Sequence, residues 1–177
     1  HFDGPGRITG EWHYPGAVDN ASGVAVALEV ARMVSESPTE PDRPVWIVLF
    51  NGEEQGLHGS RAFVDDFTDG LQGATVINVD MVGLPATPVS VTANPGASRL
   101  GELAAERLRE NGLEAAVSEG GGSDHAAFAG VAPAISLVQV PYADMHSRDD
   151  VPANAAGDVL ARIATSVHET IAALPAR

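Results

Sequence analysis

The sequence predicts an α/β fold with three layers (αβα), in which helices cover both faces of a mixed, mostly parallel sheet. Short runs of consecutive apolar residues are typical of strands that are buried on both faces. Longer segments, in which apolar residues recur every three or four positions, are typical of amphipathic helices. The two kinds of segment alternate along the 177 residues, which is the pattern of an α/β protein. We expect a single domain that covers residues 1–177.

The first half of the chain is predicted to contain two helices and two strands. Residues 1–19 are rich in Gly and Pro and are predicted to be a loop. Helical spacing of apolar residues follows at 20–36, and a Pro-rich stretch ends this helix. Six consecutive apolar residues at 45–50 predict a strand that is buried on both faces. A second helix is expected at 58–68 and a second buried strand at 75–79.

The second half repeats this alternation. Shorter strands are predicted at 89–92 and 114–117, and a third strand of the buried type at 134–140. The helix predicted at 97–111 ends in an Asn-Gly pair, which is a common stop signal. A long amphipathic helix at 154–174 closes the domain.

The composition excludes several classes of partner. The 24 Asp and Glu residues outnumber the 10 Lys and Arg residues, and the resulting net charge of -14 repels phosphate backbones, so no nucleic-acid partner is expected. No apolar run approaches the ~20 residues of a membrane-spanning helix, so no membrane partner is expected. The absence of Cys excludes disulfides, thiolate ligands and a Cys nucleophile. We expect that a signal peptide is absent from this chain, and a secreted location is favoured over a cytoplasmic one. The oligomeric state is left open.

Acidic and His residues follow the three predicted buried strands and precede the first helix. They are His1, Asp19, Glu53, Glu54, Asp80 and His146. Because functional groups of open α/β sheets gather beyond the carboxyl ends of the strands, we expect these side chains at one rim. Taken singly, each has an ordinary interpretation, such as a helix N-cap or a solvated loop residue. Gathered together, carboxylates need a cation to offset their repulsion, and mixed His and carboxylate ligands suit zinc.

Five short strings resemble, in the same order, motifs of the two-zinc aminopeptidases of metallopeptidase family twenty-eight. They are residues 16–24, 51–60, 78–83, 123–128 and 146–150. The second string contains Asn-Gly-Glu-Glu, the third Asn-Val-Asp-Met and the fourth Ser-Asp-His. Together they span most of the chain, and the resemblance implies the zinc-dependent exopeptidase fold.

The resemblance implies two zinc sites that share one ligand. His1, Asp19 and Asp80 would hold one zinc ion. Glu54 and His146 would hold the second ion together with Asp19, which would bridge the two. The expected cofactor is therefore two Zn²⁺ ions, or one if the site that contains His1 is incomplete.

The resemblance also implies roles for residues that bind no metal. Glu53 would be the general base that takes a proton from a metal-activated water molecule. Asp3 would support the site of His1, and Asp150 would orient His146. The candidates for substrate binding are Ser123, Asp124, His125 and Tyr142.

Three further features bear on the resemblance. It implies a cis peptide bond between Asp19 and Asn20. Met145 stands where some relatives carry a Tyr that helps to hold the oxyanion. The first His of the family follows further upstream structure, whereas nothing precedes His1 here, so the catalytic domain is expected to lack its N-terminal segment.

The function that the resemblance implies is hydrolysis of the N-terminal peptide bond of peptides with a free N-terminus, by a zinc aminopeptidase. Two alternatives stay open. One is a glutaminyl-cyclase-like acyltransferase, which has the same fold and works with one zinc ion. The other is a catalytically inactive peptide-binding domain. The presence of both His1 and Asp80 favours the aminopeptidase.

Overall fold

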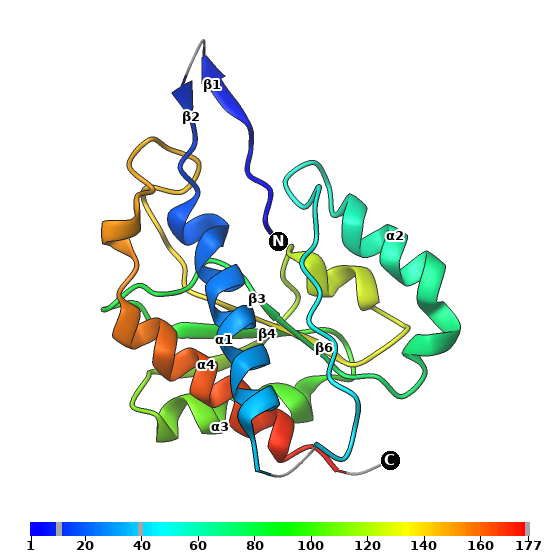
Figure 1. Ribbon diagram of the computed structural model, residues 1–177. Helices are drawn as coiled ribbons and strands as arrows, with labels where there is room; N and C mark the ends of the chain where they lie inside the picture. The colour runs from blue at the N-terminus through cyan, green and yellow to red at the C-terminus, as the bar shows by residue number, and fades with distance from the viewer. Residues whose placement is uncertain (10–11, 39–40, 176–177) are drawn as a thin grey trace.

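A mixed sheet of four strands forms the centre of the molecule. The computed structural model describes residues 1–9, 12–38 and 41–175. The strands are β3 (Val76–Val79), β4 (Val89–Ala93), β5 (Ala115–Glu119) and β6 (Ala134–Val138). They lie in the order β3, β6, β4, β5 (Figure 1). β3 is parallel to β6 and β5 is parallel to β4, whereas β4 and β6 are antiparallel, so the sheet is mixed as predicted.

Helices cover both faces of this sheet. α1 (Ser22–Glu36), α3 (Ser98–Glu110) and α4 (Gly157–Ala172) pack together on one face. α2 (His58–Phe67) and the short helical turn η3 (Asp124–Phe128) contact each other on the opposite face (Figure 1). The predicted three-layer α/β class is therefore confirmed.

Three further helical turns connect these elements. They are η1 (Ala17–Ala21), η2 (Thr68–Leu71) and η4 (Pro152–Asn154). η1 leads directly into α1 and contacts η4, so two segments far apart in the sequence meet beside the start of α1. Among the described residues, no helix combines the length and the apolar character that crossing a membrane requires.

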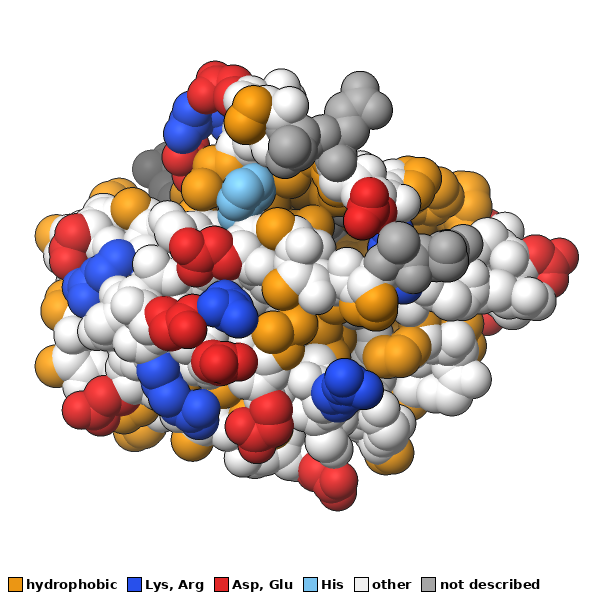
Figure 2. Space-filling view, turned by 90° about the horizontal axis from the view of Figure 1, so that it is seen from below, with side chains coloured by type: hydrophobic (Ala, Val, Ile, Leu, Met, Phe, Trp, Pro, Cys, Tyr) orange, Lys and Arg blue, Asp and Glu red, His pale blue; other side chains and the backbone are white. Residues whose placement is uncertain are grey.

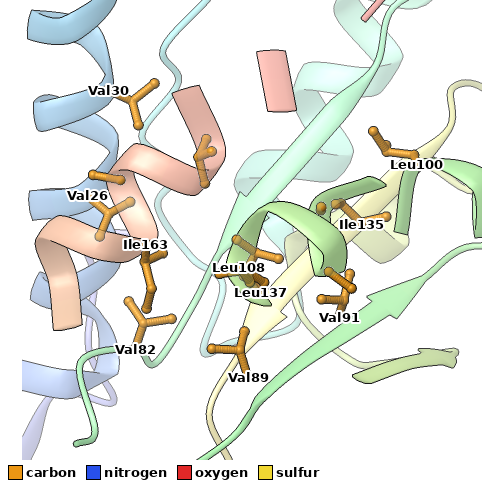
Figure 3. Packing of buried hydrophobic residues seen from close by; sticks show 14 of the residues in the cluster. Val26, Val30, Val82, Val89, Val91, Leu100, Leu108, Ile135, Leu137 and Ile163 are labelled. Atoms are coloured by element: carbon orange, nitrogen blue, oxygen red, sulfur yellow. The ribbon is translucent and has the colours of Figure 1, made fainter. Parts of the chain in front are cut away.

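The larger hydrophobic core lies between the sheet and α1, α3 and α4. Along β4, Val89, Val91 and Ala93 are buried while the residues between them are half-buried, because alternate side chains of a strand point to opposite faces. Val26 and Val30 lie one helical turn apart on the inner side of α1. Figure 3 shows these side chains packed with others from the three helices and from β6, including Leu100, Leu108, Ile135, Leu137 and Ile163.

The structure corrects the strand predicted at 45–50. This segment is extended, but among the described residues it belongs to no sheet. Its side chains reach the solvent: Trp46 is 59% exposed, and Ile47 and Val48 are each 37% exposed. An apolar run indicates a preference for burial, whereas membership of a sheet also requires a neighbouring strand within hydrogen-bonding distance. Here a groove separates the segment from β3, the nearest edge of the sheet.

The structure also corrects the loop predicted at 1–19. β1 (Arg7–Thr9) and β2 (Trp12–His13) form an antiparallel pair that projects at the top of Figure 1. Strands of three and two residues are too short to display the alternation by which a strand is recognised in a sequence.

Candidate metal centre

Five side chains from distant parts of the sequence meet at one end of the molecule. Asp80 directly follows β3, and Asp19 lies within η1. Glu54 follows the extended segment 45–50, and His146 lies in the loop after β6. His1 completes the group. The structure thus brings together all five residues that the resemblance implies as metal ligands.

The first ligand set consists of His1, Asp19 and Asp80. The Nε2 atom of His1 lies 3.4 Å from Oδ1 of Asp19 and 3.3 Å from Oδ1 of Asp80. All three residues are buried. The set is therefore enclosed, and its atoms converge on one point.

The second ligand set consists of Asp19, Glu54 and His146. The Nε2 atom of His146 lies 3.1 Å from Oδ2 of Asp19 and 3.0 Å from Oε2 of Glu54. The His146 side chain is 43% exposed, so this set opens toward solvent. Because Asp19 contributes Oδ1 to the first set and Oδ2 to the second, its carboxylate can bridge two ions.

Both sets fit a zinc ion. In each set the ligand atoms lie within 4.8 Å of one another. Tetrahedral zinc with bonds of about 2.0 Å places neighbouring ligand atoms ~3.3 Å apart, close to the distances found here. Among the described residues, no group donates a hydrogen bond to the buried Oε1 of Glu54. Buried carboxylate oxygens without a donor are costly unless a cation compensates them.

The pKa shifts of the site also indicate that its carboxylates need a nearby positive charge. Burial raises the pKa of Glu53 to about 7; the charge of His1 opposes this rise, and neighbouring carboxylates add to it. Burial raises the pKa of Glu54 as well, helped by repulsion from Asp19. Burial alone would lower the pKa of His1, but hydrogen bonds with Asp19 and Asp80 outweigh it and raise the pKa to about 11. Without a metal ion, the cluster therefore holds protons in place of the missing positive charge.

Glu53 lines the same cavity as both ligand sets but belongs to neither. Its Oε2 atom is 3.8 Å from Nε2 of His1. The backbone N–H groups of Glu53 and Glu54 each donate to the Asp3 carboxylate over 3.3 Å. The same carboxylate lies 3.4 Å from Nδ1 of His1. Asp3 therefore links His1 to the turn that carries Glu53, consistent with a supporting role for Asp3.

Asp150 makes a different contact from the one that the resemblance implies. Its carboxylate accepts hydrogen bonds from the backbone N–H groups of Val18 (2.7 Å) and Asp19 (3.1 Å). The hydroxyl of Tyr142 also donates to it, over 3.0 Å. Within the described part of the chain, no hydrogen bond joins Asp150 to His146. Asp150 therefore fixes the backbone of the shared ligand, Asp19, and not the imidazole of His146.

Asn20 is a site residue that the sequence analysis missed. The Asp19–Asn20 peptide bond is cis, as the resemblance implies. The Asn20 side chain accepts hydrogen bonds from the N–H groups of Gly23 and Met81, and it donates to the carbonyl of Val79. It thereby ties the start of α1 to the residues on either side of Asp80. In the sequence, an Asn before a helix indicates only an N-cap, so no signal identified these contacts.

A cavity of about 360 Å³ adjoins the two ligand sets. Besides the ligands and Glu53, its lining includes Met81, Thr92, Ser123, His125, Ser136, Val138, Val140 and Met145. Of the four substrate-binding candidates, Ser123 and His125 therefore border this cavity, whereas Asp124 and Tyr142 do not. Tyr142 turns its hydroxyl to Asp150 and accepts from Asn154. His125 is fully buried, and its Nε2 lies 3.0 Å from the carbonyl of Gly120, so it braces the cavity wall.

Comparison with protein families gives one match over nearly the whole chain. The family described as Peptidase family M28 matches residues 1–171. Aminopeptidase YwaD of Bacillus subtilis is 36% identical over 123 residues, which are 64% of this chain and 26% of that protein. A probable zinc metalloprotease of Pyrenophora tritici-repentis is 44% identical over 70 residues, 39% of this chain and 16% of that protein.

Solved structures of similar proteins share the fold. The aminopeptidase from Aneurinibacillus sp. strain AM-1 superimposes with a TM-score of 0.78 at 28% identity, covering 89% of this chain and 39% of that one. BSAP, a zinc aminopeptidase from Bacillus subtilis, gives a TM-score of 0.78 at 28% identity, covering 89% and 42%. The chain therefore spans less than half the length of these relatives.

Proposed function

The chain belongs to peptidase family M28, and we propose that it forms the catalytic part of a zinc aminopeptidase, which hydrolyses the N-terminal peptide bond of a peptide. One observation carries the proposal: two ligand sets share the Asp19 carboxylate, and Glu53 stands beside both without joining either. We assign one Zn²⁺ ion to each set. The relatives named zinc metalloprotease and zinc aminopeptidase support zinc as the metal.

Glu53 has the position of a general base. When bound, the zinc ions would lower the pKa of a water molecule and polarise the scissile carbonyl group. Glu53 accepts a proton from that water and later delivers it to the leaving amine. The backbone N–H groups of Glu53 and Glu54 donate to the Asp3 carboxylate. These two hydrogen bonds hold the turn that carries Glu53, and so keep the Glu53 carboxylate in place while it accepts and delivers the proton.

The substrate is proposed to be a peptide with a free N-terminus. Its ammonium group carries the charge that the acidic rim attracts, and acetylation would remove that charge. Met81, Val138 and Val140 line the same cavity and offer apolar contacts to the first side chain. Acetylated peptides should therefore not be cleaved.

The two alternatives differ in their products. A glutaminyl-cyclase-like enzyme works with one zinc ion, whereas here both ligand sets are complete, so this alternative is less well supported. An inactive binding domain has no use for an acidic side chain that stands beside both ligand sets and contributes to neither. Mass spectrometry of a Leu-started and a Gln-started peptide separates the three. Loss of one residue indicates the aminopeptidase, loss of ammonia from the Gln peptide indicates the cyclase, and unchanged peptides indicate a binding domain.

Matched Glu→Gln variants test the roles of individual carboxylates. Glu53→Gln should keep its zinc and lose about 10²–10⁴ in turnover, the usual contribution of a general base. Glu54→Gln should lose zinc from the second ligand set. Glu102→Gln, at an exposed position on α3, should change neither quantity. Equal turnover in Glu53→Gln and Glu102→Gln would show that Glu53 transfers no proton.

A further inference from the structure

Tyr14 lies at the base of the β1–β2 hairpin. The hairpin projects at the top of Figure 1, and Tyr14 directly follows β2. Its N–H donates to the carbonyl of Gly6 over 3.4 Å, which closes the base of the hairpin. The face seen from below in Figure 2 carries acidic, basic and hydrophobic side chains side by side, as is usual for a solvated surface. The Tyr14 side chain, in contrast, is half-buried, so it has neighbours that are worth identifying.

The loop after β6 gives the His146 imidazole little support of its own. The backbone φ of His146 is 54°, a left-handed conformation that residues with a side chain rarely adopt. Its Nε2 atom faces the other two ligands of the second set, Asp19 and Glu54. Within the described ranges, its Nδ1 atom has no hydrogen-bond partner. A His ligand usually takes its orientation from the partner of its other ring nitrogen, so here another contact has to fix the ring.

The ring of Tyr14 makes such a contact. Its centroid lies 6.5 Å from that of the His146 imidazole, and the two ring planes are inclined by 58°. Aromatic pairs attract one another at centroid separations of about 4.5–7 Å and prefer tilted arrangements to a face-to-face sandwich. A ring in this position limits the rotation of the imidazole. Tyr14 is not among the residues that line the cavity at the metal centre, so it acts on that site through His146.

Backbone hydrogen bonds hold the two segments that carry these rings together. The N–H of Ala17, three residues after Tyr14, donates to the carbonyl of Asp150 over 3.3 Å. The next two N–H groups, those of Val18 and Asp19, donate to the Asp150 carboxylate. The segment 14–19 therefore lies along the loop that carries His146. The same pairing places the Asp19 carboxylate at one end of the segment and the Tyr14 ring at the other.

We propose that Tyr14 is a positioning residue, whose ring holds the His146 imidazole where its Nε2 atom completes the second ligand set. The aromatic ring carries this role and not the hydroxyl, because the hydroxyl makes no hydrogen bond to any described residue. The role rests on the proposed function in one respect, namely that the second ligand set binds a metal ion. It does not require turnover of a peptide.

Zinc titration of three variants tests this role. Tyr14→Ala should weaken binding of the ion in the second set by roughly 10–100-fold, the usual effect of losing a group that orients a ligand. The ion in the first set should bind as in the unmodified protein. Tyr14→Phe should keep the full affinity, because it retains the ring. Phe67→Ala is the matched control, since Phe67 is 46% exposed and its ring packs against Phe63 on α2, away from the lining of the cavity.

The outcomes separate this role from the proposed function. Unchanged affinity in Tyr14→Ala, or an equal loss at both ions, would overturn the role of Tyr14. If Glu54→Gln loses an ion while Tyr14→Ala binds both normally, only the role of Tyr14 is overturned. If Glu54→Gln still binds both ions, the second ligand set does not hold zinc, and the two-zinc assignment is overturned together with this role.

Nuclear magnetic resonance of the metal-free protein adds a measurement that needs neither zinc nor activity. The imidazole C–H signals of His146 can be assigned by their absence from His146→Gln. They should move in Tyr14→Ala, because they lose the ring current of Tyr14, and they should stay close to their unmodified positions in Tyr14→Phe and Phe67→Ala. Signals that do not move in Tyr14→Ala would show that the two rings are not in contact, and would overturn the proposal.

Discussion

Asp19 supplies one carboxylate oxygen to each ligand set, so its position decides whether two ions can share it. The residues that position it come from distant parts of the sequence. The Asp150 carboxylate accepts hydrogen bonds from the N–H groups of Val18 and Asp19, which lie more than 130 residues away in the sequence. Asn20 binds residues on either side of Asp80. The shared ligand is therefore held through its backbone as well as through any metal ion.

Asp150→Ala tests this support. The substitution leaves two N–H groups without an acceptor, and each buried unpaired donor costs about 1–3 kcal/mol. We expect the free energy of unfolding of the metal-free protein to fall by about 2–6 kcal/mol, measured by denaturant titration. Asp158→Ala is the control, since the Asp158 side chain is 74% exposed and pairs with Arg162 on the surface. If both variants unfold alike, Asp150 does not support Asp19.

The pH dependence of zinc binding follows from His1. In the metal-free chain its pKa is about 11, so the ring carries a proton at neutral pH. Zinc can bind the ring nitrogen only after that proton leaves. Zinc affinity of the first set should therefore rise roughly tenfold per pH unit while the pH stays below this pKa. Calorimetry in buffers of different ionisation enthalpy should detect the released proton, and an affinity that is constant between about pH 6 and 8 would contradict the assignment of His1.

At the scale of single residues, the sequence predicted which residues meet at one rim better than it predicted the contacts that support them. Asp80 directly follows one apolar run and Glu54 lies in the turn after another, so their place at one rim could be inferred from the order of the chain. The contact of Asp150 with the backbone of Asp19 could not be inferred from the sequence, because it depends on how two loops meet in three dimensions.

Among the elements, helices were predicted more accurately than strands. The helix expected at 58–68 is α2 (His58–Phe67), and the helix expected at 97–111 is α3 (Ser98–Glu110). Helical periodicity is local, so the sequence displays it in full. Strand pairing depends on a partner elsewhere in the chain, which explains why the apolar run at 45–50 was wrongly placed in the sheet.

The junction of α1 and β3 leads to a prediction about Gly23. A Cβ atom there would lie 2.3 Å from the carbonyl oxygen of Val79 and 2.4 Å from Oδ1 of Asn20. Ala is the better helix former by about 1 kcal/mol, yet the clash with backbone should outweigh this gain. Gly23→Ala should therefore lower the free energy of unfolding by about 1–3 kcal/mol. The measurement is thermal or denaturant unfolding.

Gly157→Ala is the matched control for this variant. Gly157 begins α4, and a Cβ atom there meets nothing within 4 Å. Ala should be neutral or stabilise the protein by up to ~1 kcal/mol. If both substitutions have the same effect, close approach of α1 to β3 does not matter for stability.

For the whole molecule, metal binding and folding should be coupled. Asp19, Glu54 and Asp80 repel one another when no cation is present, so zinc should stabilise the folded state. A chelator should lower the melting temperature and added zinc should restore it; an excess of 100 times the dissociation constant corresponds to ~2.7 kcal/mol. Asp19→Asn, which weakens both ligand sets, should show a smaller shift. Identical melting curves with and without zinc would contradict the coupling.

The fold class could be predicted because the alternation of apolar runs and helical segments extends over the whole chain. The sequence did not indicate that β3 would be an open edge beside a groove. Strand pairing depends on which segments meet in three dimensions, and the side chains of 45–50 stay exposed beside that groove.

The most direct test of the two-zinc assignment is anomalous diffraction at the zinc edge from crystals of the full-length protein. We expect two peaks about 3.5–4 Å apart, as in other two-metal sites. One peak should lie against His1, Asp19 and Asp80, and the other against Asp19, Glu54 and His146. A single peak, or peaks that do not share the Asp19 carboxylate, would contradict it.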